Sequence, residues 1–394
     1  MIDFSFTPKT LKAKKSAQKG AEYLSSLSRY YDDHEHQELK PEEINKIREL
    51  SAQTQKIMTE PGPGDGGFLS MIVLSEEQSA GDPMMGGAAG AASKTGLGNA
   101  AINAVATPDQ KKRFGHLYCA MAITEPGFGS DTAAVSTTAK LDTATNEWVL
   151  NGEKIFVTAG QRCEAIVVWA TVDKSKGRAA IKSFVVEKFR KGCTLTKLEH
   201  KLGIRASDTA SILLEDCRIP FDNILGSPEV KAAKGGQAGV FATFDATRPV
   251  VASMALGVAK AAMDFTKEKL EEAGVTFPYD RGIHSLSAVQ KEVLDMEANL
   301  EVAKLLVWQS ASMLDKALRN SLESSMGKAK AGRAATLVCQ KCVSLLGPLG
   351  YSREWLAEKW MRDCKINDIF EGTGQIQMLI VCRQILGFTR DQLK

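Results

Sequence analysis

The sequence predicts an α+β multidomain protein in which a helical N-terminal domain, a middle antiparallel β domain and a helical C-terminal bundle follow one another. Its 394 residues are more than a single hydrophobic core usually fills. The spacing of apolar residues changes from a helical period to a period of two near residue 118, and it returns to the helical period near residue 239. We therefore expect domains over residues 1–118, 119–230 and 231–394.

The first domain is expected to contain helices only. Polar amphipathic patterns over residues 8–58 predict two helices. A Pro/Gly-rich segment at 61–67 follows them, and an apolar helical pattern begins near Phe68. No strand-like alternation occurs before residue 118.

The middle domain carries strand patterns of even spacing, which favour a small antiparallel barrel or sandwich. Asn151 and Gly152 lie between β-prone residues in the stretch 148–157, and an Asn-Gly pair in that setting predicts the turn of a hairpin. Further strands are expected over 166–171, 181–186 and 210–214.

Long helical patterns over 240–273, 286–320 and 326–346 fill the last domain. Because short loops join them, we expect an antiparallel bundle. Cys339 and Cys342 lie inside one of these apolar helical patterns, so we interpret them as packing residues rather than as a metal or redox pair.

Composition excludes several classes of protein. The net charge is only +3 and the basic residues are dispersed among nearly as many acidic ones, which argues against a nucleic-acid partner. No apolar stretch reaches the roughly 18 residues of a membrane span, so no stable membrane insertion is expected. The first residues show no basic-then-apolar leader, which favours a cytoplasmic protein. The only close histidine pair, in His34-Glu35-His36, lies in an acidic stretch that we interpret as surface, and no metal site is expected.

Two motifs can carry chemistry. In ITEPGFGSD, residues 123–131, a glycine-spaced loop leaves a strand and exposes backbone N–H groups that can bind polar ring atoms or phosphate, although the motif alone could equally be a turn. In NDIFEGTGQIQ, residues 367–377, apolar Ile369 and Phe370 precede Glu371. Such surroundings raise the pKa of a carboxyl and make it a competent base. A helix-capping glutamate is the equal alternative.

These motifs, together with WVLNGEKIFVTAG at 148–160, KLGIRASDTASILLEDCRIP at 201–220 and FDATRPVVASMALGVA at 244–259, resemble the acyl-CoA dehydrogenase family in order and spacing. The resemblance covers nearly the whole chain. It implies a helical N-terminal domain, a middle β-barrel and a C-terminal four-helix bundle, assembled as a homotetramer. It also implies FAD as cofactor, an acyl-CoA substrate and an electron-transfer flavoprotein as partner.

The resemblance assigns a role to each matching residue. Glu371 would be the base that removes the α-proton of the acyl thioester, and its backbone N–H would polarise the thioester oxygen as in an oxyanion hole. The residues expected to bind FAD are Ile123, Thr124, Ser130, Phe156, Thr158, Phe277, Thr373 and Gln375. Those expected to bind the acyl-CoA are Ser130, Phe244, Asp245, Arg248 and Gly372.

The departures from the family pattern open other interpretations. Phe156 stands where the family usually stacks a Trp on the flavin, and Gly274 stands where an Arg-x-Thr-Phe motif places the Arg that grips the FAD diphosphate. These departures suggest an FAD-poor subunit of a heteromeric, for example heterotetrameric, complex, although the retained Glu371 argues against it. An acyl-CoA reductase that uses the same site in reverse is a further alternative, because the same residues serve both directions.

Asp82 lies in a segment that matches the helix lining the family's acyl pocket. A carboxylate is a poor neighbour for an alkyl tail, since burying it unpaired costs several kcal/mol. We therefore hypothesise that Asp82 is a second catalytic acid/base or recognition group, suited to a cyclic or functionalised acyl-CoA. A helix-capping or solvent-facing Asp82 is the alternative. The function that the sequence predicts is flavin-dependent α,β-dehydrogenation of an acyl-CoA thioester.

Overall fold

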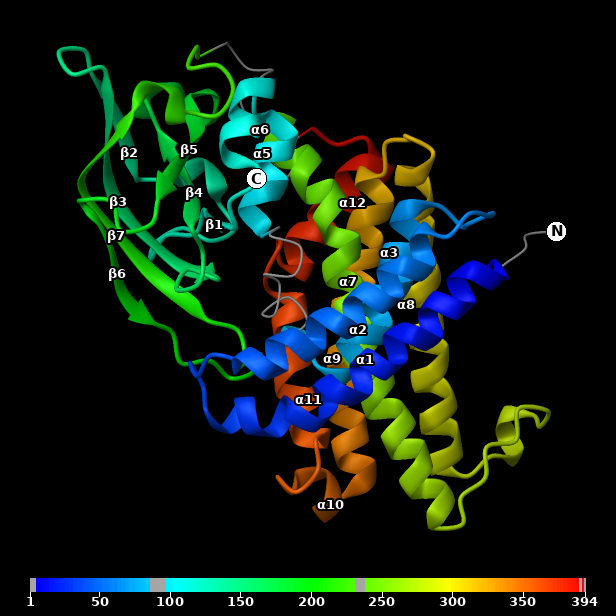
Figure 1. Ribbon diagram of the computed structural model, residues 1–394. Coiled ribbons are helices and arrows are strands. Elements are labelled where there is room, and N and C mark those ends of the chain that lie inside the picture. Colours follow the sequence, from blue (N-terminus) through cyan, green and yellow to red (C-terminus); the bar gives the residue numbers. More distant parts are fainter. Residues whose placement is uncertain (1–4, 86–95, 231–237, 390–391, 393–394) are drawn as a thin grey trace.

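The predicted succession of a helical, a β and a second helical domain is confirmed (Figure 1). The computed structural model describes residues 5–85, 96–230, 238–389 and 392. The β domain lies beside the helices, and the two helical domains pack against each other along their length (Figure 1).

Helices alone form the described part of the first domain, as predicted. Thr7 begins the first of them, because its side chain accepts a hydrogen bond from the Thr10 backbone N–H. The helices of this domain are α1 (Pro8–Asp33), α2 (Pro41–Thr59), α3 (Gly67–Gly81), α5 (Leu97–Val105) and α6 (Pro108–Phe114). Helix α3 lies between α1 and the C-terminal bundle, which cover it on two sides. Its residues Ile72 and Val73 are therefore buried.

The middle domain is one curled sheet in the order β1-β4-β2-β3-β7-β6, with β5 paired to β4. Its strands are β1 (Cys119–Ala122), β2 (Thr138–Asp142), β3 (Glu147–Thr158), β4 (Ala165–Thr171), β5 (Ile181–Glu187), β6 (Cys193–Leu198) and β7 (Thr209–Pro220). Most pairs are antiparallel as predicted, but β1 and β2 each pair with β4 in parallel. Trp148, Leu150 and Phe184 contribute to the core inside the curl.

The predicted hairpin turn at Asn151 and Gly152 is wrong. Both residues lie inside the continuous strand β3, where the register against β7 shifts between Leu150 and Gly152. Gly152 has φ +151°, and a Cβ there would lie 2.7 Å from the Cα of Thr137 on the neighbouring strand. The glycine is therefore required by a β-bulge and a close backbone approach rather than by a chain reversal.

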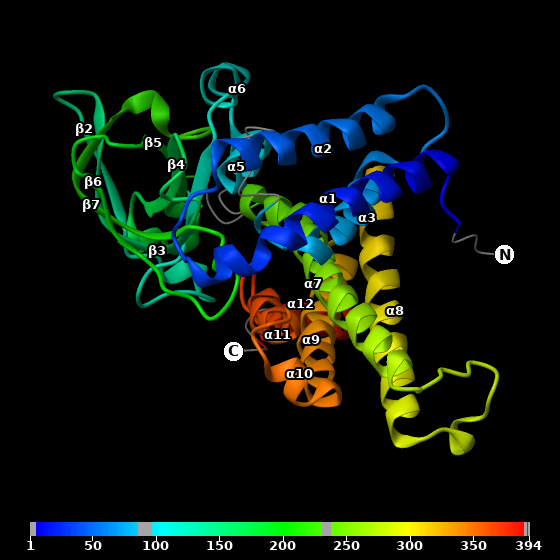
Figure 2. The same ribbon diagram turned by 60° about the horizontal axis from the view of Figure 1, so that its bottom comes forward.

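The last domain is a bundle of α7 (Ala238–Glu272), α8 (Ala288–Asp315), α9 (Ser321–Leu346) and α12 (Gly374–Leu386), with the shorter α10 (Pro348–Tyr351) and α11 (Ala357–Cys364) at one end. Cys339 and Cys342 are buried in its core, as predicted for packing residues. The connection between α7 and α8 projects from the side of the molecule away from the sheet (Figure 2). Short 3₁₀ helices occur at Thr132–Ala134, Lys174–Ala180, Phe221–Asn223, Ile283–Ser285 and Lys365–Asp368. Among the helices described, none combines the length and apolar character of a membrane span.

Candidate active site

Glu371 and Gly372 form a strained turn between the bundle helices α11 and α12. Their φ angles are +55° and +86°, in the left-handed region that costs a residue with a side chain about 1–2 kcal/mol. The surrounding structure holds the turn in place. The Gly372 carbonyl accepts hydrogen bonds from Lys328 Nζ at 2.5 Å and from Gln377 Nε2 at 3.1 Å, and Gln377 also reaches the Glu371 carbonyl at 3.2 Å. Strain maintained in this way is typical of functional sites.

The Glu371 carboxyl has the environment of a base. Burial raises its pKa above the usual 4.5, while a hydrogen bond from the Thr247 hydroxyl at 2.9 Å and the charges of Arg248 and Lys328 act in the opposite direction. The residue as a whole is only partly buried. The capping alternative is wrong, because Thr373 begins α12 by accepting a hydrogen bond from the Ile376 N–H at 3.2 Å.

Helix α7 places two further predicted residues beside Glu371. Arg248 is buried and donates to Asp245 Oδ1, one turn earlier, at 2.6 Å. Thr247, which the sequence analysis missed, lies between them in the chain and contacts Glu371 directly. The side chain of Phe244 lies outside the described residues. The structure thus brings together Glu371, Gly372, Asp245 and Arg248 from segments that are more than 120 residues apart.

A buried ion pair holds the loop at residues 123–131. Lys154 Nζ from β3 donates to Glu125 Oε1 at 2.7 Å and to the Ile123 carbonyl at 3.0 Å. Glu125 also accepts from the backbone N–H and the hydroxyl of both Ser136 and Thr137, at 2.5–2.9 Å.

The pKa values of both members of the pair are lowered, but for different reasons. The donors around Glu125 outweigh the effect of burial and lower the pKa of its carboxyl to about 2. Burial lowers the pKa of Lys154 to about 8, because enclosing an ammonium group costs more than one carboxylate restores. The ion pair therefore holds the loop at residues 123–131 in place against β3.

Phe156 projects from the edge of this loop region. Its φ of +54° falls at a second register shift of β3, between Lys154 and Val157, and 58% of its surface is exposed. The Thr124 carbonyl accepts from the Ile155 N–H at 2.9 Å, which places the loop beside this strand. Gly127 and Gly129 have open space where a Cβ would lie, so protein packing does not explain their lack of a side chain. The exposed ring and the open loop leave room for a ligand to pack against this edge of the sheet.

The chain is similar to known proteins in both sequence and fold. The chain matches the description "Acyl-CoA dehydrogenase, middle domain" over residues 120–217 and "Acyl-CoA dehydrogenase, C-terminal domain" over residues 235–386. It is 32% identical to the acryloyl-CoA reductase (NADH) of Anaerotignum propionicum, over 98% of this chain and 96% of that protein. The chain belongs to the acyl-CoA dehydrogenase family.

Other acyl-CoA dehydrogenases are similar in sequence and in structure. The mitochondrial short-chain specific enzyme of Mus musculus is 39% identical over 67% of this chain, and the matched part spans 62% of the length of that relative. The butyryl-CoA dehydrogenase of Megasphaera elsdenii has a structure that superposes with a TM-score of 0.80 and 28% identity, covering 98% of this chain and 100% of that one.

The family is FAD-dependent, and the loop region fits such a cofactor. The exposed Phe156 ring, the half-buried Ile123 and the hydroxyls of Thr124 and Thr158 offer an apolar face beside polar donors. Ser130 and Gln375 are exposed, so both remain accessible to a ligand.

Phe277 lies apart from these residues. It belongs to the α7–α8 connection, which projects from the bundle (Figure 2). Its ring packs on the bundle core, with Lys267 Nζ 5.2 Å from the ring centre. Within one chain it is not brought to the loop at 123–131. A role in binding FAD therefore requires the loop of another subunit.

Asp82 lies in a separate buried cluster of side chains. Its Oδ2 accepts from Ser28 Oγ at 2.7 Å and from Lys359 Nζ at 3.0 Å, and its Oδ1 accepts from the backbone N–H groups of Met84 and Met85. The capping alternative fits these contacts, since the last two bonds are those of a helix cap. Lys359 also donates to Asp363 at 2.5 Å, so the cluster ties the end of α3 to α11.

We expect Asp82→Ala to lower the free energy of unfolding by about 3–5 kcal/mol, because it removes a partner from a buried ion-pair cluster. Urea unfolding measures this loss, and Asp295→Ala on the exposed face of α8 is the control. The rate per FAD-loaded subunit should change equally with linear and cyclic acyl-CoAs. A loss confined to cyclic acyl-CoAs would instead support the hypothesis that Asp82 is a catalytic or recognition group.

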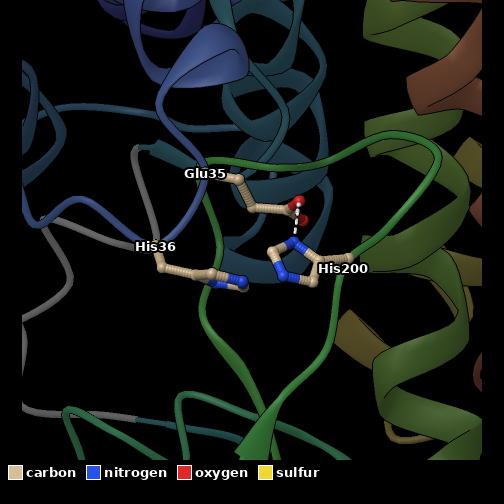
Figure 3. Close-up of side chains that lie close together, drawn as sticks. All are labelled: Glu35, His36 and His200. Atoms are coloured by element: carbon tan, nitrogen blue, oxygen red, sulfur yellow. Dashed lines mark hydrogen bonds and ion pairs between the residues drawn. The ribbon is translucent and has the colours of Figure 1, made fainter.

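The predicted surface triplet around Glu35 is partly buried. The Glu35 side chain is only 3% exposed, so the prediction is wrong at this residue. Glu35 accepts from His200 Nδ1 at 3.2 Å, and the imidazole of His36 faces that of His200 (Figure 3). Possible metal-ligating atoms of these three residues lie within 4.8 Å of one another.

This cluster is better suited to an ion-pair network than to a metal. Lys201 Nζ and Arg205 Nε also bind the Glu35 carboxylate, at 3.1 and 3.2 Å. A divalent cation would have to displace or approach both positive groups, which repel it. We therefore interpret the cluster as a link between the end of α1 and the loop before β7.

Proposed function

We propose that this protein catalyses the flavin-dependent α,β-dehydrogenation of an acyl-CoA thioester. The observation that carries the proposal is Glu371, a carboxyl whose pKa burial raises and whose position a strained turn fixes. A carboxylate of raised pKa is a better general base near neutral pH than an ordinary glutamate, and it can take the weakly acidic proton next to a thioester when the thioester oxygen is polarised.

Each group around Glu371 has a role in this reaction. The carboxylate removes the α-proton, and the Glu371 backbone N–H donates to the thioester oxygen as negative charge develops there. Thr247 holds the carboxylate through its hydroxyl. Asp245 and Arg248 bind the CoA part of the substrate, with Phe244, Gly372 and Ser130 as further contacts.

Bound FAD would supply the acceptor for the β-hydrogen, which leaves as a hydride. Phe156 and Ile123 pack against the flavin, while the hydroxyls of Thr124, Thr158 and Ser130 orient it. Thr373 and Gln375 bind its diphosphate and adenosine part, and Phe277 contributes from a neighbouring subunit. We accordingly propose a tetramer in the cytoplasm that passes its electrons to an electron-transfer flavoprotein.

Two observations favour other assignments of the same site. A relative that aligns with almost the whole chain is named an acryloyl-CoA reductase, which would use these residues in the reverse direction. Gly274, in place of the family's Arg, favours an FAD-poor subunit of a heteromeric complex.

The experiment is to purify the protein, measure FAD per chain and oligomeric mass, and add acyl-CoAs without oxygen. Butyryl-CoA, glutaryl-CoA and cyclohexanecarboxyl-CoA test linear, dicarboxylic and cyclic substrates. We expect stoichiometric FAD and bleaching of the flavin absorbance by at least one of them. Reoxidation of reduced enzyme by an enoyl-CoA, with no reduction by the saturated partner, would instead indicate a reductase. Little FAD in a homogeneous preparation would favour the heteromeric subunit.

A further inference from the structure

Lys328 is a buried lysine beside Glu371 to which the proposed function assigns no role. Only 1% of its surface is exposed, and its ammonium group donates to the carbonyl of Gly372 at 2.5 Å. Among the residues that the structure describes, it forms no ion pair. A buried ammonium without a carboxylate partner is costly, so it needs an explanation.

Local packing aims Lys328 at the turn. It lies in the middle of α9, and Gly332 follows it by one helical turn on the same face. A Cβ at Gly332 would lie 2.8 Å from the carbonyl oxygen of Asn367. The missing side chain lets α9 approach the segment before Glu371, and this approach brings the lysine to the Gly372 carbonyl.

The turn that Lys328 holds carries two groups of the proposed site. Both the carboxyl and the backbone N–H of Glu371 take their direction from the left-handed conformation at residues 371 and 372. The neutral Gln377 of α12 also donates to the carbonyls of Glu371 and Gly372. Lys328 is therefore the charged group that anchors it.

We propose that Lys328 is a positioning residue for Glu371, which fixes the Glu371–Gly372 turn through the Gly372 carbonyl and places a positive charge close to the carboxylate. This inference rests on the proposed function and deepens it. It assigns Lys328 no contact with the substrate.

The charges around the pair set the direction of the expected pH effect. Arg248 from α7 and Lys328 from α9 favour the Glu371 carboxylate. Burial lowers the pKa of Lys328 to about 8, and the charge of Arg248 acts in the same direction. The charges of Asp368 and Glu371 act in the opposite direction and favour the ammonium form. Loss of the Lys328 charge therefore raises the pKa of Glu371. Since the base must be unprotonated, the acidic limb of the pH–rate profile moves to higher pH.

Three substitutions separate charge from hydrogen bonding. Lys328→Met removes both, Lys328→Gln keeps a donor, and Lys328→Arg keeps the charge. Lys330→Met is the matched control, because Lys330 lies on the same helix but donates to Asn299 on α8. The rate of flavin reduction by the most active acyl-CoA of the panel is measured from acidic to alkaline pH. Infrared difference spectroscopy, with Glu371→Gln to assign the band, follows protonation of Glu371 without substrate.

We expect Lys328→Met to lower the maximal rate about 10- to 100-fold with little change in KM, as a small displacement of a catalytic group does. Lys328→Met and Lys328→Gln should both raise the pH at which Glu371 protonates, and Lys328→Arg should restore it. An unchanged Glu371 titration together with a rate within twofold of the Lys330→Met control would overturn the inference, even if stability falls. Where Lys328→Met does not fold, Lys328→Gln still tests the loss of the charge through the Glu371 titration. If no acyl-CoA reduces the wild-type flavin, the proposed function fails, and the infrared titration alone decides the role of Lys328.

Discussion

Replacement of Glu371 by Gln is expected to slow reduction of the flavin by an acyl-CoA about 10²- to 10⁴-fold, because the amide cannot accept the α-proton. The substitution keeps the size of the side chain and an oxygen that can accept the hydrogen bond from Thr247. FAD content and acyl-CoA binding should therefore remain close to those of the wild type. Anaerobic stopped-flow absorbance measures the rate, and equilibrium titration measures the binding.

The wild-type pH profile provides a second readout of the same residue. Burial raises the pKa of Glu371 above the usual 4.5, and only the carboxylate acts as a base. The rate should thus rise with pH through a limb that lies above pH 4.5 and that Glu371→Gln abolishes. Glu354→Gln, at an exposed position after α10, is the control. A rate for Glu371→Gln within tenfold of this control would exclude Glu371 as the base.

Glu371 shows what local sequence can reveal about a site. The apolar Ile369 and Phe370 predicted a carboxyl of raised pKa, and burial does raise it, although Ile369 itself is 49% exposed and the burial comes from the tertiary fold. The sequence could not decide between a base and a helix cap, because that depends on which residue begins α12. Thr373 takes that position in the structure.

The error at Asn151 and Gly152 has a tertiary cause. An Asn-Gly pair supports a reversal of the chain when the strand ends there, but β7 pairs with β3 from Glu147 to Thr158 and holds it extended through the pair. Long helices were easier to predict, since their apolar period extends over many turns. The structure places α7 at Ala238–Glu272, where the pattern predicted a helix over 240–273.

The buried lysines were missed for a related reason. Lys328 follows Gly327 in a run of small residues, and apart from that run nothing in the sequence distinguishes it from an exposed lysine on a helix. Lys154 occupies a strand that elsewhere alternates polar and apolar residues. Their partners are 44 and 29 residues away in sequence. Only the fold shows that each lysine is enclosed. A lysine within a stripe of small residues is the one signal that could have identified Lys328.

Replacement of Lys154 by Met is expected to lower the free energy of unfolding by about 3–5 kcal/mol, because it leaves the Glu125 carboxylate buried without its cation. Lys154 has no exposed surface, so water cannot take over its role. The loop at 123–131 also loses the bond from Lys154 to the Ile123 carbonyl, and we expect weaker FAD binding. Urea unfolding and FAD content measure the two effects, with Lys140→Met on the exposed face of β2 as the control.

The double substitution Glu125→Gln with Lys154→Met distinguishes an ion pair from two independent contacts. Removing both charges eliminates the uncompensated carboxylate, so the double variant should be more stable than Lys154→Met alone. If the two contacts were independent, the losses of unfolding free energy of the two single variants would add in the double variant.

The dependence of stability on acidic pH tests whether Glu125 is ionised in this pair. Because the pKa of Glu125 is lowered to about 2 in the folded protein, its contribution is complete above the unfolded value of 4.5 and is lost as the pH falls towards 2. This contribution is on the order of 3 kcal/mol. Glu125→Gln should remove that part of the pH dependence, so its stability relative to the wild type should improve as the pH falls from 4.5. A constant difference between the two proteins over this range would show that folding does not lower the pKa of Glu125. The buried ion pair with Lys154 would then not be what stabilises the loop that is proposed to bind FAD.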